Sequence, residues 1–300
     1  MEHMKLFRRR ETLIENITFM AIASALVGLF ALAGSFSIIA SLVLMLVIPL
    51  LSSLVAYICK WRYLPLYLVA SVIVSFLLSF ASFQNEILFV IPSILVGLAY
   101  GMLERSKLDT SIALFVCALI EFGLFYLSIA IIKGIYEIDM VAFLLQMVGR
   151  GIDGVSEIIF PTFVFAYAFA QTAIMHLFHE IVFSRFKEER KFERFSNWVW
   201  TIGATSSILS FAFAFIYAPL AYIFFAISLY WSAFALVPVF QKPSKIPMVL
   251  LVGSIFLTVI ISAILYRAMP KYTGIIAYGF FMLFACLVSF LNHLLLRKKN

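Results

Sequence analysis

The sequence predicts an all-α, polytopic transmembrane helical bundle, and two observations lead to that fold class. Of the 300 residues, 64% are hydrophobic and 12% are charged, whereas a soluble domain is about half apolar and about a quarter charged. Apolar runs also recur along the whole chain. Each run is long enough, at about 1.5 Å per residue, to cross a hydrocarbon core of about 30 Å. We therefore predict a multi-pass protein of the cell membrane, in contact with the lipid bilayer.

Ten apolar runs are the expected spans. The first follows the basic stretch "KLFRRR" and contains "ALAG", Ala31 to Gly34, which also fits a secretory signal peptide with its cleavage site. Its length and its direct continuation into a second run favour an uncleaved first helix. The predicted spans are residues 13–35, 37–58, 64–81, 87–103, 110–132, 159–182, 198–216, 219–240, 247–266 and 273–296.

The positive charges predict the orientation. All but four of the 22 Lys and Arg residues lie in segments that ten spans would place on one side of the membrane; the exceptions are Lys133, Arg150, Arg267 and Lys271. The excess of positive charge in short cytoplasmic loops places the N- and C-termini in the cytoplasm. The basic clusters are short and lie next to spans, where orientation and anionic lipid explain them, so we expect no nucleic-acid partner.

A charged segment divides the chain into two parts. "SRFKEERKFERF", Ser184 to Phe195, mixes basic and acidic residues between the sixth and seventh spans and predicts a cytoplasmic linker helix. The expected domains are a six-helix membrane bundle over residues 1–184, the linker over 185–196 and a four-helix membrane extension over 197–300.

One carboxylate lies in the middle of the fifth span, within "CALIEFGLFYLS". A charged Glu121 facing lipid would cost about 2.5–3.5 kcal/mol, so we expect it to face the interior of the bundle. Cys117 and Ser128 share its helical face. Gln171 is similarly central in the sixth span, and antiparallel helices would bring the two residues to the same depth. The pair predicts either a hydrogen bond that ties two helices together or a ligand-binding site.

Other patterns suggest no catalytic chemistry. "HLFHE" places His176, His179 and Glu180 on one helical face but matches no zinc-protease order, and its position near the end of a span favours interfacial histidines. No G-x-x-x-x-G-K-[ST] pattern is present in the sequence, so the chain is not expected to be its own ATPase. We predict no enzymatic activity, no cofactor and no metal site.

Two pairs of small residues predict close helix packing. "AIASA" places Ala21 and Ala25 four residues apart in the first span, and "IPSILVGLAYG" does the same for Gly97 and Gly101 in the fourth. Together with the basic start and "ERSK" after the fourth span, this arrangement of the first six helices resembles the S components of energy-coupling-factor (ECF) transporters. With "FERFSNWVW" and the final "LLLRKKN", the whole chain is similar to the related YybS-type family of uncharacterised membrane proteins.

The resemblance implies a function, partners and site residues. It implies binding or uptake of a small, vitamin-like molecule, with Ala21 and Ala25 docking onto a transmembrane coupling subunit that carries an ATPase module. The outer loop before the sixth span would cover the ligand, and its polar groups nearest the ligand would be Arg150, Asp153 and Glu157. On the residues alone, Glu121 and Gln171 complete this expected site.

Two other functions fit the same sequence. Ten spans with both termini inside also suit a secondary transporter of the drug/metabolite type, built from two inverted five-helix halves. The scarcity of charge inside the spans suits a membrane scaffold or assembly partner that binds no ligand. Superposition of the two halves distinguishes the transporter, and the presence or absence of a retained small molecule distinguishes the scaffold.

Overall fold

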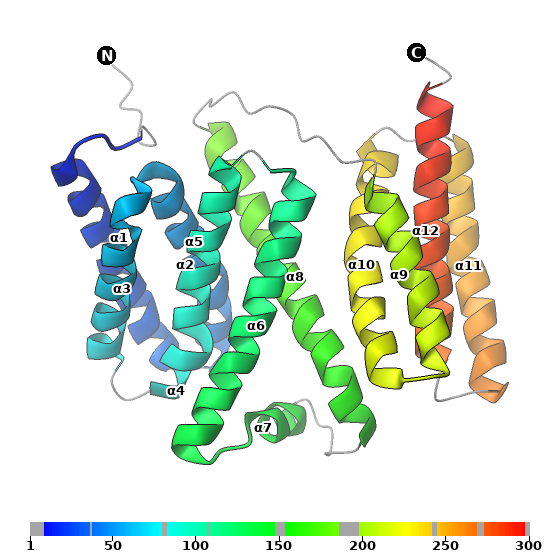
Figure 1. Ribbon diagram of the computed structural model, residues 1–300, viewed down its shortest axis with the longest axis horizontal. Helices are drawn as coiled ribbons and strands as arrows, with labels where there is room; N and C mark the ends of the chain where they lie inside the picture. The colour runs from blue at the N-terminus through cyan, green and yellow to red at the C-terminus, as the bar shows by residue number, and fades with distance from the viewer. Residues whose placement is uncertain are drawn as a thin grey trace. The chain divides into compact units, whose positions relative to one another are not determined.

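The computed structural model describes residues 9–36, 38–79, 83–106, 108–147, 154–185, 198–241, 245–268 and 273–297. Every regular element in these ranges is a helix (Figure 1). The helices are α1 Leu13–Ser35, α2 Ile38–Ile58, α3 Leu64–Leu78, α4 Phe83–Asn85, α5 Ile91–Arg105, α6 Thr110–Tyr136, α7 Met140–Met147, α8 Gly154–Arg185, α9 Trp198–Ala214, α10 Ala218–Gln241, α11 Lys245–Ala268 and α12 Thr273–Arg297, with a 3-10 turn at Trp61–Tyr63 and a π-helical turn at Glu86–Val90.

Most of these helices suit a membrane. Eight helical segments in the described residues are long and apolar enough to span one, and they contain α1, α3, α5, α6, α8, α10, α11 and α12. Two shorter apolar segments, Leu46–Ile58 of α2 and Trp198–Ala214 of α9, coincide with predicted spans. The predicted helical, multi-pass membrane architecture is therefore confirmed, while the number of ten spans and the cytoplasmic termini stay predictions.

The chain forms two compact units. Unit 1 contains Met1–Gly149 and Tyr167–Arg194, and unit 2 contains Arg150–Ala166 and Phe195–Asn300. The second boundary falls inside the predicted linker, of which residues 186–196 lie outside the described part. The first boundary differs from the expected domains, because the part of α8 before Tyr167 groups with unit 2.

In unit 1, α5 packs against α2 through the predicted glycine pair. A Cβ atom on Gly97 would lie 2.3 Å from the carbonyl oxygen of Pro49, and one on Gly101 would lie 2.4 Å from that of Ser53. The backbones of the two helices are therefore too close for any side chain at these positions. Elsewhere in the unit the helices are joined by hydroxyls, as in the 2.9 Å hydrogen bond between Ser24 of α1 and Ser71 of α3.

One end of unit 1 is held by polar contacts to the end of α2, and we call it the basic end because Arg10, Arg62 and Arg105 lie there. The Arg105 guanidinium donates to the carbonyl oxygens of Ala56 and Cys59 at 3.0 and 2.8 Å. These contacts supply donors to carbonyls that have no partner inside the helix, and they place a cation at its negative end.

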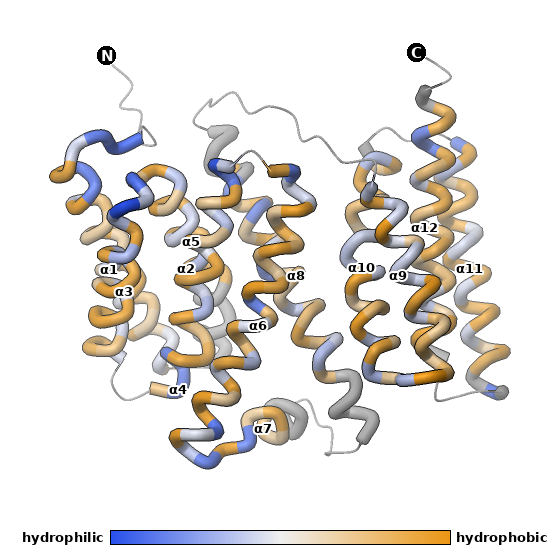
Figure 2. Tube along the Cα trace, in the orientation of Figure 1, coloured by the Kyte–Doolittle hydropathy of each residue, from blue (hydrophilic) through white to orange (hydrophobic). Residues whose placement is uncertain are grey.

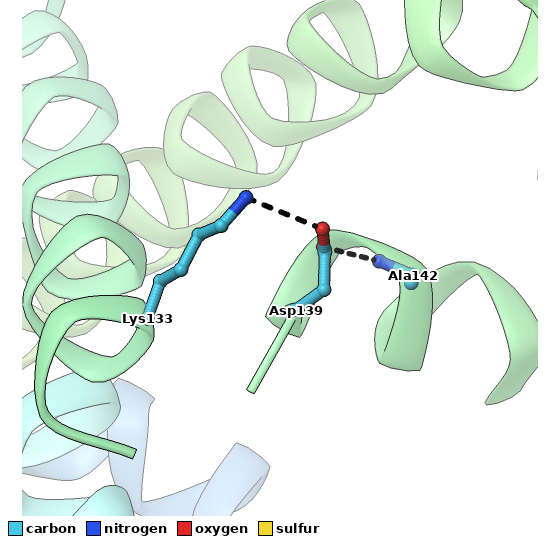
Figure 3. Close-up of polar contacts among 3 residues, drawn as sticks. All are labelled: Lys133, Asp139 and Ala142. Atoms are coloured by element: carbon cyan, nitrogen blue, oxygen red, sulfur yellow. Dashed lines mark hydrogen bonds and ion pairs between the residues drawn. The ribbon is translucent and has the colours of Figure 1, made fainter. Parts of the chain in front are cut away.

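At the opposite end of unit 1, α6 leads into the short helix α7, which lies across the direction of α6 in Figure 1. The chain leaves α6 through Glu137, whose φ of 57° is left-handed. Asp139 then caps α7 by accepting the Ala142 N–H at 3.1 Å, and its other oxygen lies 3.5 Å from Lys133 Nζ (Figure 3).

Unit 2 is built around serines. Ser207 of α9 and Ser228 of α10 share a 2.5 Å hydrogen bond, and Ser210 donates to the Ala221 carbonyl at 3.0 Å. Ser232 of α10 donates to the Met282 carbonyl of α12 at 3.3 Å. Interhelical hydrogen bonds of this kind hold helices together where the hydrophobic effect is absent, as it is within lipid.

The surfaces of both units carry large apolar side chains. Val249 and Phe256 of α11, for example, are 71% and 67% exposed, and Leu77 of α3 is 74% exposed. Figure 2 shows hydrophobic residues along the lengths of the long helices. Exposed apolar side chains at this density would be a liability in water but are expected for helices in contact with acyl chains.

Candidate functional site

The predicted central carboxylate is buried in unit 1. Glu121 of α6 is 4% exposed, and its Oε2 atom has no hydrogen-bond partner. The Cys117 thiol, one turn earlier in α6, and the Tyr167 hydroxyl of α8 lie within electrostatic range of its carboxyl. Glu121 therefore faces α8 and the interior of the bundle, as the cost of a charge in lipid predicts.

Gln171 lies on the same side of α8 as Tyr167, one turn further along the chain, and is 2% exposed. Glu121 and Gln171 are therefore both buried in unit 1, and their expected pairing at one depth stays a prediction. Of the two carboxyl oxygens of Glu121, Oε2 accepts no hydrogen bond from Gln171 or from any other described group. A buried acceptor or donor left without a partner costs about 1–3 kcal/mol, so the carboxyl has capacity to bind a further group.

A second polar cluster lies closer to the basic end. The Tyr100 hydroxyl of α5 is 2.7 Å from His176 Nδ1 of α8. The His179 ring packs edge-to-face against Tyr100 and against Tyr57 of α2, with ring centroids 5.4 and 5.9 Å apart. The two histidine side chains are 9% and 0% exposed and contact two other helices, α2 and α5; their interfacial position in the membrane stays a prediction. The side chain of Glu180 lies outside the described part of the chain.

A third polar cluster, which the sequence did not predict, lies toward the α7 end of unit 1. Glu86, at the start of the π-helical turn, is 1% exposed. Its Oε1 atom contacts the Ser79 hydroxyl at the end of α3, and its Oε2 atom has no hydrogen-bond partner. The predicted fourth span began at residue 87 and so treated Glu86 as a flanking residue outside the apolar run.

The π-helical turn has an identifiable cause. The Ile91 N–H bonds to the Glu86 carbonyl, one residue beyond the α-helical partner. The Ile87 carbonyl therefore loses its usual donor, the Ile91 N–H. The next residue, Pro92, has no N–H that could replace it. Ser128 of α6 supplies a donor instead, through a 2.8 Å hydrogen bond. Pro92 was the one sequence signal for an irregular turn, and π-helical turns are frequent at functional sites.

The three clusters lie at successive depths in unit 1. Ser128 contacts the carbonyl next to Glu86, and Glu121 lies about 10 Å along α6 from Ser128 at about 1.5 Å per residue. Tyr100 lies about 20 Å along α5 from Glu86 on the same estimate. Buried polar and ionisable side chains therefore recur from the α7 end of unit 1 to its basic end, and Glu121 lies between the other two clusters.

The remaining predicted residues lie elsewhere. Ala21 and Ala25 are both exposed on the outer face of α1, while Gly97 and Gly101 are buried against α2. Arg150 and Asp153 lie outside the described residues. The side chain of Glu157, in α8, is also outside the described part, so these three expected ligand contacts stay predictions.

Neither metal geometry nor known relatives assign a chemistry to these clusters. Among the residues that the structure describes, no group of three His, Cys, Asp or Glu side chains could hold a metal ion. Comparisons of the chain with protein-family models, with curated proteins and with solved structures found no significant match. The interpretation of the site therefore depends on its own geometry.

Proposed function

We propose that the chain binds a small, polar, vitamin-like molecule inside unit 1 and takes part in its uptake across the membrane. The observation that carries the proposal is the Glu121 carboxyl, which is buried in a helical membrane bundle with one oxygen unpartnered. Ionisable side chains in such a setting are expensive and usually mark the path or the site of a solute. Gln171 and Tyr167 add an amide and a hydroxyl to the same interior face.

The division into units favours an S-component-like bundle rather than a protein built from two five-helix halves. Inverted halves would separate after α6, so that α8 would belong wholly to the second half. Instead, the part of α8 from Tyr167 onward groups with α1–α6. This grouping supports the six-helix arrangement that the sequence resemblance implies, although the part of α8 before Tyr167 groups with α9–α12.

Coupling to an energy source is proposed through α1. Ala21 and Ala25 are exposed, and small exposed residues one turn apart allow another helix to approach closely. We propose that this face docks onto a transmembrane coupling subunit with its ATPase module. Co-purification tests it: Ala21→Leu should remove the partner, whereas Ala33→Leu, at an exposed alanine near the other end of α1, should not. Equal recovery of the partner with both variants, or no such partner with the wild type, would contradict the coupling.

Mass spectrometry of small molecules retained through mild purification tests the binding function. The wild-type protein should retain a defined molecule, and Glu121→Leu should lose it. The matched control is Ser289→Ala, a buried polar residue of unit 2, which should retain it. Absence of any molecule from the wild type, or equal retention by all three proteins, contradicts the proposal. Recovery of other membrane proteins without a small molecule would favour the scaffold.

A further inference from the structure

The Glu86 cluster contains more oxygen atoms than hydrogens to bond them. The Ser79 hydroxyl contacts both Glu86 Oε1 and the Ser75 carbonyl oxygen, the latter at 2.7 Å. The Ser75 hydroxyl, which also acts on the carboxyl, donates to the Val72 carbonyl at 3.0 Å. A serine hydroxyl has one hydrogen, and a backbone carbonyl can only accept. Each serine therefore has one hydrogen for two acceptors, a carbonyl of α3 and the Glu86 carboxyl.

The state of the carboxyl follows from this count. An ionised Glu86 would compete with the Ser75 carbonyl for the Ser79 hydrogen at Oε1, and its Oε2 atom would carry charge with no donor at all. A protonated Glu86 instead donates its own hydrogen to Ser79 Oγ, which passes a hydrogen bond on to the Ser75 carbonyl. The contact between Oε1 and Ser79 Oγ then joins one donor to one acceptor. This arrangement also avoids the cost of an unpaired charge in an apolar interior.

Within the part of the chain that the structure describes, no positive charge compensates an ionised Glu86. The π-helical turn packs against α2, α3, α4, α5 and α6. The groups that act on the carboxyl are the hydroxyls of Ser79 and Ser75, and no charged or titratable side chain of those helices is among them within the described residues. Nor do the described residues place three His, Cys, Asp or Glu side chains together as a group that could hold a metal ion.

We propose that Glu86, Ser79 and Ser75 form a proton-binding site at the π-helical turn, in which the neutral carboxyl donates to the Ser79 hydroxyl. The ligand is a proton, held as the O–H of the Glu86 side chain and exchangeable with solvent. The site goes beyond the proposed function and does not depend on it, since the test below needs no solute.

Infrared spectroscopy of the full chain in lipid vesicles at pH 7 tests the site, because the carbonyl stretch of a protonated carboxyl is separate from that of a carboxylate. The wild type should show this band, and Glu86→Gln should lose the intensity of one carboxyl. Glu11→Gln, at an exposed glutamate, is the matched control and should leave the band unchanged. Equal band intensity in the wild type and Glu86→Gln would overturn the proposal.

Two further measurements keep the proposal testable if Glu86→Gln fails to fold. Ser79→Ala removes the acceptor of the proposed hydrogen bond, so the band should stay but shift in frequency, and an unshifted band would overturn the site. Replacement of choline chloride by sodium chloride at constant pH should leave the band unchanged. Its loss in sodium would show that the site takes a metal cation instead, and would also overturn the proposal.

Discussion

The two units bury polar side chains of different kinds. In unit 2, the described buried polar residues are serines, Thr258 and Asn292, whereas unit 1 also buries Glu86, Glu121, His176 and His179. Hydroxyls suffice to join helices in both units, at little cost when they bond to a neighbouring carbonyl. Ionisable groups are more expensive to bury and are not needed for packing. The difference supports the proposal that the binding site lies in unit 1.

The largest expected effect concerns the tighter backbone contact of unit 1. Gly97→Ala would place a Cβ 2.3 Å from the Pro49 carbonyl, which cannot move without shifting α2, so we expect a loss of about 1–3 kcal/mol in stability. In unit 2, the Cβ of Gly203→Ala would clash with the Cys286 Sγ at 2.7 Å, a side-chain atom that can rotate away, while the nearest backbone atoms lie at 3.4 Å, so the loss should be smaller. Thermal unfolding in detergent measures both. The control is Gly123→Ala in α6, where nothing lies within 4 Å, and a larger loss at Gly203 than at Gly97 would reverse the comparison.

The second prediction separates function from stability in unit 1. Glu121→Leu replaces a buried carboxyl that has an unpartnered oxygen with an apolar side chain, so stability should be unchanged or rise by about 1–3 kcal/mol. Asn292→Leu in unit 2 also removes a buried unpartnered oxygen, Oδ1, and should behave alike in thermal unfolding. A large loss of stability in Glu121→Leu alone would mean that Glu121 is structural, and that the contrast between the units is one of packing.

The general architecture could be predicted from the sequence because hydrophobic length is a local property. Each predicted span coincides with a helix or with most of one, since about 20 apolar residues determine a transmembrane helix with little help from their neighbours. The division of α8 between units could not be predicted in this way. It depends on which helices pack against each part of α8, the part with the buried residues Phe160 and Val164 and the part with the buried Met175. Composition does not encode that choice.

The candidate site was predictable only in part, for the same reason. The burial of Glu121 follows from the cost of a charge at the centre of a span. Glu86 was missed because it lies at the edge of an apolar run, where a charge is usually solvated, and its burial depends on Ser79 and on the turn at Pro92. The interpretation of His176 as interfacial depends on its distance to the end of the span, and its contact with Tyr100 could not be predicted in that way.

A smaller effect is expected at the serine pairs, where the units should be alike. Ser24 and Ser71 of unit 1 are 2.9 Å apart, and Ser207 and Ser228 of unit 2 are 2.5 Å apart. Double-mutant cycles to alanine should give coupling energies of about 0.6 kcal/mol, and at most about 1.7 kcal/mol, for each pair. Unfolding of the single and double variants measures them. A coupling well above this range in only one unit would show that hydroxyl packing also differs between them.

The smallest effect is expected at the exposed cap of α7, a feature of unit 1 for which the connection between α9 and α10 has no counterpart. The Ala142 N–H, with a further contribution from the Lys133 charge, lowers the pKa of Asp139 below its ordinary value (Figure 3). Because the folded state depresses this pKa, the stabilisation is complete above the ordinary aspartate range of about 3.9 and is lost as pH falls through the lower, folded value.

Hydrogen exchange at the Ala142 amide should therefore speed up only in strong acid in the wild type, but already at neutral pH in Asp139→Ala. Asp139→Asn, which keeps an acceptor oxygen but loses the charge, should retain most of the protection, because the cap contributes more than the 3.5 Å ion pair between exposed side chains. Equal loss in both variants would mean that the ion pair, rather than the cap, holds α7 at the end of α6.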